Sequence, residues 1–338
     1  MSEQSWTVGR IVGWAAEYLK RHGASSSRLD SQLLLGHVTG LDRVQLYVQF
    51  DRPMLPDELD SFRELVKRRV AGEPVAYILG SREFFGHSFR VNRHVLIPRP
   101  ETEILVDAVI RWARPKPALK SVEEMEADAR TATEAQARAV VDGEPVGTPA
   151  VLESPAESPI IEAPLRIVDV GVGSGAIAIS LAIALPVATL VGIDISPDAL
   201  EVAAQNADRL GVRERVKLVR GDGLGPLKNA ASVDVVVSNP PYLDAPLMAT
   251  LEKDVRDFEP HGALSGGDDG LSMIGPLVAD AVRVLKPGGL LAIEVAGTDQ
   301  AAAVRDLIAH TGAFESAAIL DDYSRRGRVV TAIRLKGQ

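Results

Sequence analysis

The sequence predicts an α/β protein, in which a doubly wound and largely parallel sheet is preceded by a small helical unit. Two observations support this prediction. From residue 165 onward, short apolar runs typical of buried strands alternate with helical patterns, which is the order expected of a parallel sheet with helices on both faces. Before residue 75 the apolar residues recur instead with a helical period.

The composition limits the class of protein. The 338 residues are 46% hydrophobic and 25% charged, which suits a soluble protein of about two domains. No apolar run approaches a membrane helix and the first ten residues lack the pattern of a signal peptide, so we expect a cytoplasmic protein without a membrane partner. Cysteine is absent and the six histidines lack metal-ligand spacing, so we expect no metal site. A net charge of −9 argues against a nucleic-acid partner.

Residues 1–74 are predicted to form a bundle of three short amphipathic helices. Residues 75–98 are rich in β-branched and aromatic residues and contain two glycines, which predicts a β-hairpin that links two domains. The apolar face of the first helix comprises Val8, Ile11, Val12, Ala15 and Leu19, and that of the third comprises Leu59, Phe62, Val66 and Val70.

The second domain is predicted to span residues 99–338. A helix is expected from Thr102 to Ala113, after which residues 115–163 carry no aromatic residue and are rich in alanine, proline and acidic residues. Such a composition predicts a disordered insertion. Within the helix, the residues expected to face inward are Ile104, Leu105, Ala108, Val109 and Trp112.

The alternating part of the chain supplies the sheet. Continuous apolar strands are predicted at 166–171, 189–195, 216–222, 233–239 and 290–296, with a final pair at 314–322 and 328–335. Helices are predicted at 176–185 and at 196–211, the second with Ser196 as its N-cap and Gly211 as its stop.

A glycine-rich loop follows the first of these strands. Glycines there permit a tight turn and let a ligand approach the backbone, and the free N–H groups of the next helix favour an anionic or polar ligand. The pattern is compatible with NAD, FAD or S-adenosylmethionine. The loop comprises Gly171, Val172, Gly173, Ser174 and Gly175.

Two acids end the next two strands. Asp194 lies 19 residues beyond Gly175, where a carboxylate can accept hydrogen bonds from both ribose hydroxyls. Asp222 ends the third strand, where it can accept a bond from an adenine amino group. The alternatives are a helix-flanking acid at Asp194 and a turn residue at Asp222.

The fourth strand runs directly into Asn239, Pro240, Pro241 and Tyr242. Two prolines cannot continue a sheet ladder and make a stiff corner, although an ordinary strand-ending turn is the alternative. The strand ends carry no proton relay of the kind that a dehydrogenase needs. Methyl transfer to a planar nitrogen requires fixed acceptors for its N–H groups and an aromatic platform. Asn239 Oδ1 and the Pro240 carbonyl suit the first role and Tyr242 the second.

At this point the sequence resembles a known family over nearly its whole length apart from the insertion. The segments GEPVAYILG, REFFGHSFRVN, VLIPRPETE, DVGVGSGAIAI, VSNPPY, EPHGALSGGDDGL and LKPGGLLAIEV are similar to the PrmC/HemK release factor glutamine N5-methyltransferases. VLIPRPETE is more specific than NPPY, because nucleic-acid enzymes that share NPPY lack the N-terminal half.

The resemblance implies a class I S-adenosylmethionine-dependent methyltransferase domain with a Rossmann-like, seven-stranded sheet, and an N-terminal domain that docks class 1 peptide chain release factors. It implies N5-methylation of the glutamine in their Gly-Gly-Gln motif. The loop 171–175 and Asp194 would then bind the cofactor, with Asp222, Gly223 and Asn239 beside it. Residues 239–242 would bind the glutamine side chain.

Some positions depart from the family or stay open. Gly223 stands where the family often has an aromatic residue, and Glu294 and Gln300 differ in spacing from the family pattern and have no assigned role. Glu101 and Glu103 are interpreted as helix-start acids rather than catalytic helpers. Arg99 and Thr102 are expected to shape the pocket entrance.

Three alternative functions remain open at this point. A glutamine methyltransferase of a ribosomal protein would share much of the catalytic domain. A nucleic-acid base N-methyltransferase would use the same chemistry on a flipped base and usually adds a basic cleft. A nucleotide-binding module without catalytic activity is the third.

Overall fold

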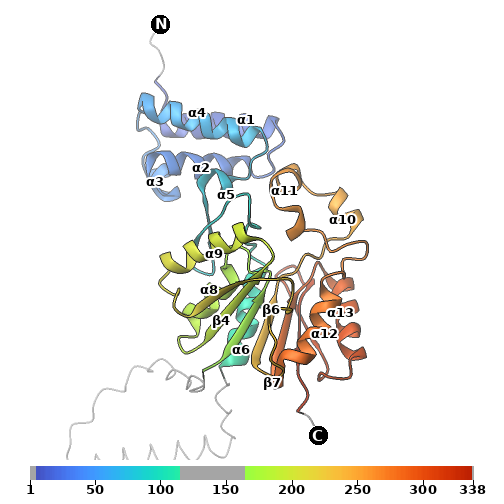
Figure 1. Ribbon diagram of the computed structural model, residues 1–338. Helices are drawn as coiled ribbons and strands as arrows, with labels where there is room; N and C mark the ends of the chain where they lie inside the picture. The colour runs from blue at the N-terminus through green and yellow to red at the C-terminus, as the bar shows by residue number, and fades with distance from the viewer. Residues whose placement is uncertain (1–4, 115–163, 337–338) are drawn as a thin grey trace, which may run out of the picture.

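The computed structural model describes residues 5–114 and 164–336 and shows a helical domain above a sheet domain (Figure 1). The N-terminal helices pack around one apolar core, and the sheet carries helices on both faces. The predicted insertion at 115–163 lies outside the described residues.

The helical domain contains two short helices that the sequence did not predict. Its long helices are α1 (Val8–Arg21), α2 (Ser27–Thr39) and α4 (Pro56–Val70), and its short ones are α3 (Arg43–Val48) and α5 (Val75–Leu79). A capping box between Asp42 and Gln45 starts α3. The hairpin therefore begins later than residue 75, because Pro74 and Gly80 bracket a helical turn there.

The connecting hairpin comprises β1 (Ser81–Phe84) and β2 (His87–Arg90). Its two-residue turn has both positions in the left-handed region, with φ +48° at Phe85 and +75° at Gly86. The hairpin docks on the sheet domain at both ends. The Arg90 N–H donates to Asn206 Oδ1 at 2.7 Å, and the Phe85 N–H donates to Glu103 Oε1 at 2.8 Å.

The described residues form a seven-stranded sheet in the order β5-β4-β3-β6-β7-β9-β8, which confirms the predicted fold class. The first five strands in this order are parallel, and β9 runs antiparallel to both of its neighbours. The strands are β3 (Arg166–Val170), β4 (Thr189–Asp194), β5 (Val216–Arg220), β6 (Val233–Ser238), β7 (Leu285–Glu294), β8 (Ala318–Asp321) and β9 (Gly327–Ile333).

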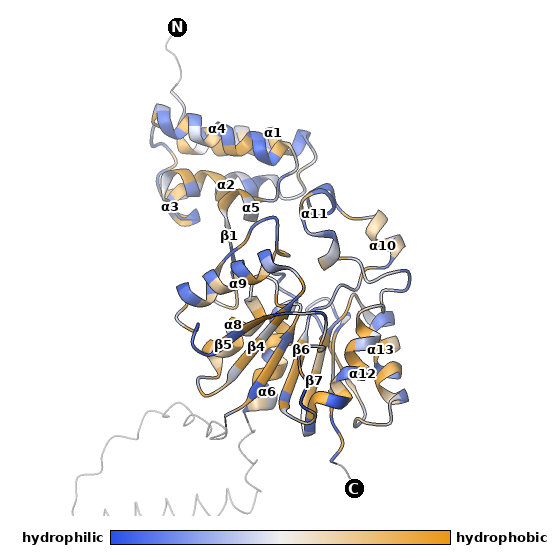
Figure 2. Ribbon diagram, viewed as in Figure 1, coloured by the Kyte–Doolittle hydropathy of each residue, from blue (hydrophilic) through white to orange (hydrophobic). Residues whose placement is uncertain are grey.

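Helices cover both faces of this sheet. One face packs against α6 (Thr102–Ala113), α8 (Ala176–Ala184) and α9 (Pro197–Arg209), and the other against α12 (Ile274–Val284) and α13 (Thr298–His310). Successive strand residues alternate between the two cores, as Ile167 and Val168 do, and Figure 2 shows the central strands as largely hydrophobic.

The bounds of α6 match the prediction, but its inward face was only partly right. Leu105 and Val109 are buried as expected. The helix is rotated relative to the predicted face, so Val106 and Ile110 are also buried and Trp112 is only partly covered.

The segment between β6 and α12 folds into α10 (Ala245–Ala249), α11 (Lys253–Phe258) and the short helix η1 (His261–Ala263). Figure 1 shows α11 beside the helical domain. Arg69 of α4 joins the two domains there: its guanidinium lies 2.8 Å from Asp30 and 3.3 Å from Asp254 of α11. The segment that follows the predicted site is thus anchored to the helical domain.

Candidate active site

The candidate site lies where the strand order reverses. The chain moves from β3 to β4 and β5 on one side and then returns to β6 and β7 on the other, so the loops after β3 and β6 diverge from a common crevice. Open α/β sheets bind ligands at such a point. A Cβ atom added to Gly171 would lie 3.9 Å from the Asn239 carbonyl oxygen, which shows how closely the two loops face each other.

A cavity of about 560 Å³ opens at this point. Its lining also includes His94, Val95 and Leu96, which lead from the hairpin toward α6. Val95 and Leu96 begin the segment VLIPRPETE, but none of the three was assigned to the site from the sequence. The predicted site residues that line it are Gly171, Gly173, Asp194, Asp222, Gly223, Asn239, Pro240 and Pro241.

The glycines of the loop differ in what surrounds them. Gly171 and Gly173 have φ +76° and +51°, and added Cβ atoms would meet nothing closer than 3.9 Å. Their open sides belong to the cavity. Gly175 does not line it, because its α-hydrogen side is filled by the body of the domain: an added Cβ would lie 2.7 Å from Ile179 Cδ1.

Val172 and Ser174, which were also predicted to bind the cofactor, do not line the cavity. Val172 is buried against Gly192 of β4. Ser174 is buried as well, and its carbonyl accepts a hydrogen bond from Asn206 Nδ2 at 2.8 Å. Asn206 bonds to Arg90 of the hairpin at the same time, so these residues support the loop from beneath.

Asp194 is held by the loop that it faces. Its Oδ2 accepts a bond from the Gly173 N–H at 2.9 Å, and its Oδ1 accepts one from the Ser196 N–H at 2.9 Å. A carboxylate oxygen can accept a second bond, so both oxygens remain available to hydroxyl groups. Asp222 is exposed at the rim, and no atom lies within 4 Å of the Cβ position of Gly223.

The two ends of the NPPY segment are tied down separately. Asn239 Nδ2 donates to Thr102 Oγ1 at 3.2 Å, and the Tyr242 hydroxyl donates to Glu294 Oε1 at 3.3 Å. Gln300 Nε2 donates to the Tyr242 carbonyl at 2.9 Å and to the Gly270 carbonyl at 3.1 Å. Glu294 and Gln300 therefore gain roles that the sequence did not reveal. Thr102, which was expected to shape the pocket entrance, lines neither this cavity nor the smaller one described below and instead binds Asn239.

Close approach of a glycine segment also fixes Tyr242. A Cβ atom added to Gly266 would lie 2.8 Å from the Tyr242 Cα. One added to Gly270 would lie 2.5 Å from the Tyr242 carbonyl oxygen. A side chain at either glycine would displace the Tyr242 backbone. This is a physical reason for the glycines in the segment SGGDDGL.

A smaller cavity of about 290 Å³ adjoins the first. Leu96, Asn239 and Ala263 line both cavities, so Asn239 lies where they meet. The remaining lining of the smaller cavity is mostly apolar, with Arg99 as its charged residue: Arg99, Tyr242, Leu243, Leu251, Val255 and Leu264.

The acids near the site have distinct environments. Burial raises the pKa of Glu294 to about 7, and burial likewise raises that of Asp169, beneath the glycine loop, to about 7. Glu259 pairs with Arg99 and accepts a bond from the Ile97 N–H at 3.0 Å. Glu103 is occupied by the Phe85 N–H of the hairpin.

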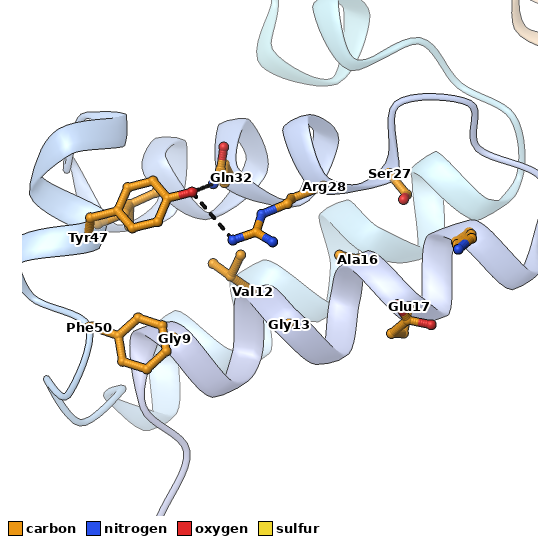
Figure 3. Close-up of a pocket in the computed structure, with 12 residues that line it drawn as sticks. Gly9, Val12, Gly13, Ala16, Glu17, Ser27, Arg28, Gln32, Tyr47 and Phe50 are labelled. Carbon is orange, nitrogen blue, oxygen red and sulfur yellow. Dashed lines mark hydrogen bonds between the residues drawn. The ribbon is translucent and has the colours of Figure 1, made fainter.

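A separate cavity of about 500 Å³ lies in the helical domain between α1, α2 and α3 (Figure 3). The Tyr47 hydroxyl accepts hydrogen bonds from Gln32 at 3.1 Å and from Arg28 at 3.4 Å. The Phe50 ring lies against Gly9, where an added Cβ would come within 2.2 Å of it. This cavity contains none of the predicted site residues.

In residues 5–114 and 164–336, no group of three or more histidine and acidic side chains is placed to hold a metal ion. No helix in the described ranges combines the length and the apolar character needed to cross a bilayer.

Comparison with known proteins gives two family matches. Residues 11–80 match the PrmC N-terminal domain, and residues 161–320 match a methyltransferase domain. Among curated relatives, the release factor glutamine methyltransferase of Geobacter sulfurreducens is 37% identical, covering 91% of this chain and 90% of the relative. The enzyme of the same name from Rhodopirellula baltica is 34% identical, and the match covers 98% of this chain and 97% of the relative. That from Moorella thermoacetica is 37% identical, and the match covers 97% of this chain and 99% of the relative. The chain belongs to the release factor glutamine methyltransferase family.

Proposed function

We propose that this enzyme transfers a methyl group from S-adenosylmethionine to the side-chain nitrogen N5 of the glutamine in the Gly-Gly-Gln motif of class 1 release factors. The observation that carries the proposal is the position of Asn239 between a large cavity and a small one. A methyl donor and an acceptor side chain that entered from opposite sides would meet at this amide.

The large cavity fits the cofactor. Gly171 and Gly173 present bare backbone to it, which suits close approach of an amino-acid and ribose moiety. Asp194 offers free lone pairs on both oxygens for ribose hydroxyls, and Asp222 lies at the rim for the adenine amino group. The open space at Gly223 leaves room for the base but supplies no stacking ring.

The small cavity suits a glutamine side chain. Its apolar lining accommodates the methylene groups. We assign Asn239, which lines both cavities, and the carbonyl of the adjoining Pro240, which lines the large one, as acceptors for the amide N–H groups. Because Asn239 Nδ2 is engaged with Thr102, Oδ1 is the atom left for the substrate. Tyr242 lines the same cavity, and we assign to its ring the role of packing against the planar amide.

Positioning accounts for much of the chemistry. The cofactor supplies an electrophilic methyl group on a sulfonium centre. An amide nitrogen is a weak nucleophile, so two fixed acceptors that favour its electron-rich, partly pyramidal form lower the barrier. Correct orientation of two reactants is worth roughly 7–11 kcal/mol. In such a transfer the N–C bond would form as the S–C bond of the donor breaks, and one amide proton would leave to solvent.

We assign docking of the release factor to the helical domain. Residues 11–80 match the PrmC N-terminal domain, and the exposed apolar residues of the domain include Trp14, Val44, Tyr47 and Val48. Exposed apolar side chains that gather on one small domain are typical of a protein-binding surface. A substrate that acts on the ribosome places the reaction in the cytoplasm.

The test is a methylation assay with the purified protein and S-adenosylmethionine. A class 1 release factor, the same factor with its loop glutamine replaced by asparagine, a ribosomal protein mixture and nucleic acid are offered separately. We expect the mass of one methyl group on the loop glutamine of the first substrate alone. Methylation of a ribosomal protein or of nucleic acid without methylation of the release factor would overturn the proposal, and cofactor binding without any transfer would indicate a binding module.

A further inference from the structure

One buried arginine connects the helical domain to the segment that follows the NPPY motif. The side chain of Arg69, on α4, is only 9% exposed. Its Nε donates to Asp30 Oδ2 at 2.8 Å and its Nη1 donates to the Glu73 carbonyl at 3.2 Å, and both partners belong to the helical domain. Its Nη2 donates to Asp254 Oδ2 of α11 at 3.3 Å. One guanidinium group therefore binds both domains.

The bond to Asp254 is not needed to neutralise Arg69. Asp30, whose side chain is 8% exposed, already supplies a carboxylate that balances the charge of the guanidinium. The donors of an arginine lie along the edges of one rigid plane, so the two bonds within the helical domain fix the direction in which Nη2 points. The third bond therefore places α11 relative to the helical domain.

Helix α11 forms part of the wall of the small cavity. Val255, which follows Asp254, and Leu251, which precedes the helix, both line that cavity. Glu259, directly after α11, is buried and pairs with Arg99, which lines the same cavity. The bond from α4 thus acts on a helix whose neighbouring side chains shape the cavity.

The end of α4 also packs against α11, which lies beside the helical domain in Figure 1. A Cβ atom added to Gly72 would lie 3.4 Å from Lys253 Cε and 3.4 Å from Phe258 Cε2. Such apolar contacts are non-directional and bring the helix close to the domain. A hydrogen bond depends on both distance and angle, so it selects one position among those that the packing allows.

We propose that Arg69 is a positioning residue for the acceptor site: it holds α11 through Asp254, so that Val255 and Leu251 shape the small cavity around the substrate side chain. The inference rests on the proposed function, which places the glutamine in that cavity. The helical domain then has a second role, because it sets one wall of the site as well as docking the release factor. A misplacement of about 1 Å can cost about 100-fold in rate, so a shift of this wall should lower kcat.

Kinetics with release factor test the proposal. We expect Asp254→Ala to lower kcat at least about tenfold and to keep the KM for release factor within about twofold, because the docking surface is untouched. Asp254→Asn keeps an oxygen that can accept from Arg69 and should regain most of the rate. Arg69→Lys keeps a positive charge beside Asp30 but loses the rigid fork, and it should lower kcat at least about threefold.

Coupling between the two residues is the sharper kinetic test. In the Arg69→Lys background, Asp254→Ala should lower kcat by a smaller factor than it does in the wild type, because the bond is already lost. An equal factor in both backgrounds would overturn the proposal, as would a wild-type kcat in Asp254→Ala. Thermal unfolding checks that each variant is folded.

Two neighbouring charge pairs provide matched controls. Arg68 precedes Arg69 on α4 and pairs with Glu73 within the helical domain at 2.6 Å. Asp257 follows Asp254 by one helical turn on α11 and pairs with the adjacent arginine at 2.9 Å. Arg68→Lys and Asp257→Ala should leave kcat and KM near the wild-type values. A loss of kcat in these controls as large as that in Asp254→Ala would mean that any change of charge at this junction slows the enzyme, and would overturn the assignment to Arg69.

Hydrogen exchange in the free enzyme separates this inference from the proposed function. The backbone amides of residues 251–259 should exchange at least about threefold faster in both Asp254→Ala and Arg69→Lys, and at the wild-type rate in Arg68→Lys. Asp254 also lies in the first turn of α11, where an acid stabilises its own helix. Faster exchange in Asp254→Ala alone would therefore refute the link.

The two hypotheses fail in different ways. Unchanged exchange in both variants would refute the link between α4 and α11 even if release factors are methylated. Faster exchange in both variants of a protein that methylates no release factor would refute the proposed function and leave the link standing.

Discussion

The Gly173 N–H donates a hydrogen bond to Asp194 Oδ2 at 2.9 Å, so the glycine loop after β3 and the acid that ends β4 form one unit. The same carboxylate accepts from the Ser196 N–H and so also fixes the start of α9. Two backbone N–H groups orient Asp194 before any ligand arrives, which reduces the entropy lost when hydroxyl groups bind to it.

Replacement of this acid should affect cofactor binding more than folding. We expect Asp194→Ala to weaken S-adenosylmethionine binding by about 1.5–3 kcal/mol, the range for hydrogen bonds to a charged group. Asp194→Asn keeps one acceptor oxygen and should lie between the wild type and alanine. Calorimetric titration measures the affinities, and thermal unfolding checks the fold. An unchanged affinity in Asp194→Ala would move the ribose site away from β4.

Removal of the Asn239 amide should reduce transfer more than cofactor binding. Asn239→Ala removes one of the two proposed acceptors at the junction of the cavities, and we expect methylation to fall at least about 100-fold, as on loss of a transition-state hydrogen-bonding group. Asn239→Asp keeps an acceptor but adds negative charge near the sulfonium, which stabilises the charged ground state, so it should also be slow. Single-turnover methylation of a release factor measures both rates. A near wild-type rate in Asn239→Ala would mean that the NPPY segment is only a strand-ending turn without a catalytic role.

Two exposed valines on α3 test the docking assignment. Val44 and Val48 are 71% and 80% exposed and lie one helical turn apart, so both side chains point to the same side. If release factor covers them, Val44→Ser/Val48→Ser should raise the KM for release factor at least about fivefold, or about 1 kcal/mol, and leave kcat unchanged. Val187→Ser, which changes an exposed valine in the loop before β4, is the control. Equal KM values for wild type and the double variant would place docking elsewhere.

The sheet could be predicted from the sequence because each strand has a recognisable local sequence pattern. Each central strand is a continuous apolar run, and the turns and caps between them use residues with strong conformational preferences, such as Ser196, whose side chain accepts from the Ala199 N–H. The short helices of the N-terminal domain were harder to predict. Val75, Tyr77 and Ile78 favour strands by composition, yet they form α5. A single helical turn there buries Ile78 in the core of the helical domain and Tyr77 against the segment that follows the hairpin.

The site was predictable only where a residue acts through its own chemistry. Asp194 and Asn239 could be chosen because each follows a strand and carries an acceptor. Thr102, Glu294 and Gln300 support Asn239 and Tyr242 from positions 52 to 137 residues away in sequence, and such pairings depend on how the strands assemble. Val172 and Ser174 are buried and do not line the cavity, because a sequence motif does not distinguish the exposed side of a loop from its packed side.

The dependence of stability on pH provides a further test of the Glu294 environment. Burial raises the pKa of Glu294 from 4.5 to about 7 in the folded protein. Between these values the unfolded chain releases its proton while the native protein retains it, so Glu294 makes the free energy of unfolding decrease as pH rises and adds a constant penalty above about pH 7.

The Glu294→Gln variant should lack this contribution. The difference in unfolding free energy between Glu294→Gln and the wild type should therefore increase in favour of the variant as pH rises through the window from 4.5 to about 7, and then level off. Its span should be at most about 3 kcal/mol, since each pKa unit corresponds to about 1.4 kcal/mol. Asp169 has a similarly raised pKa but is present in both proteins, so its contribution cancels. Denaturant titrations at several pH values measure the difference, and a constant difference across this window would mean that Glu294 ionises in the fold as it does in the unfolded chain.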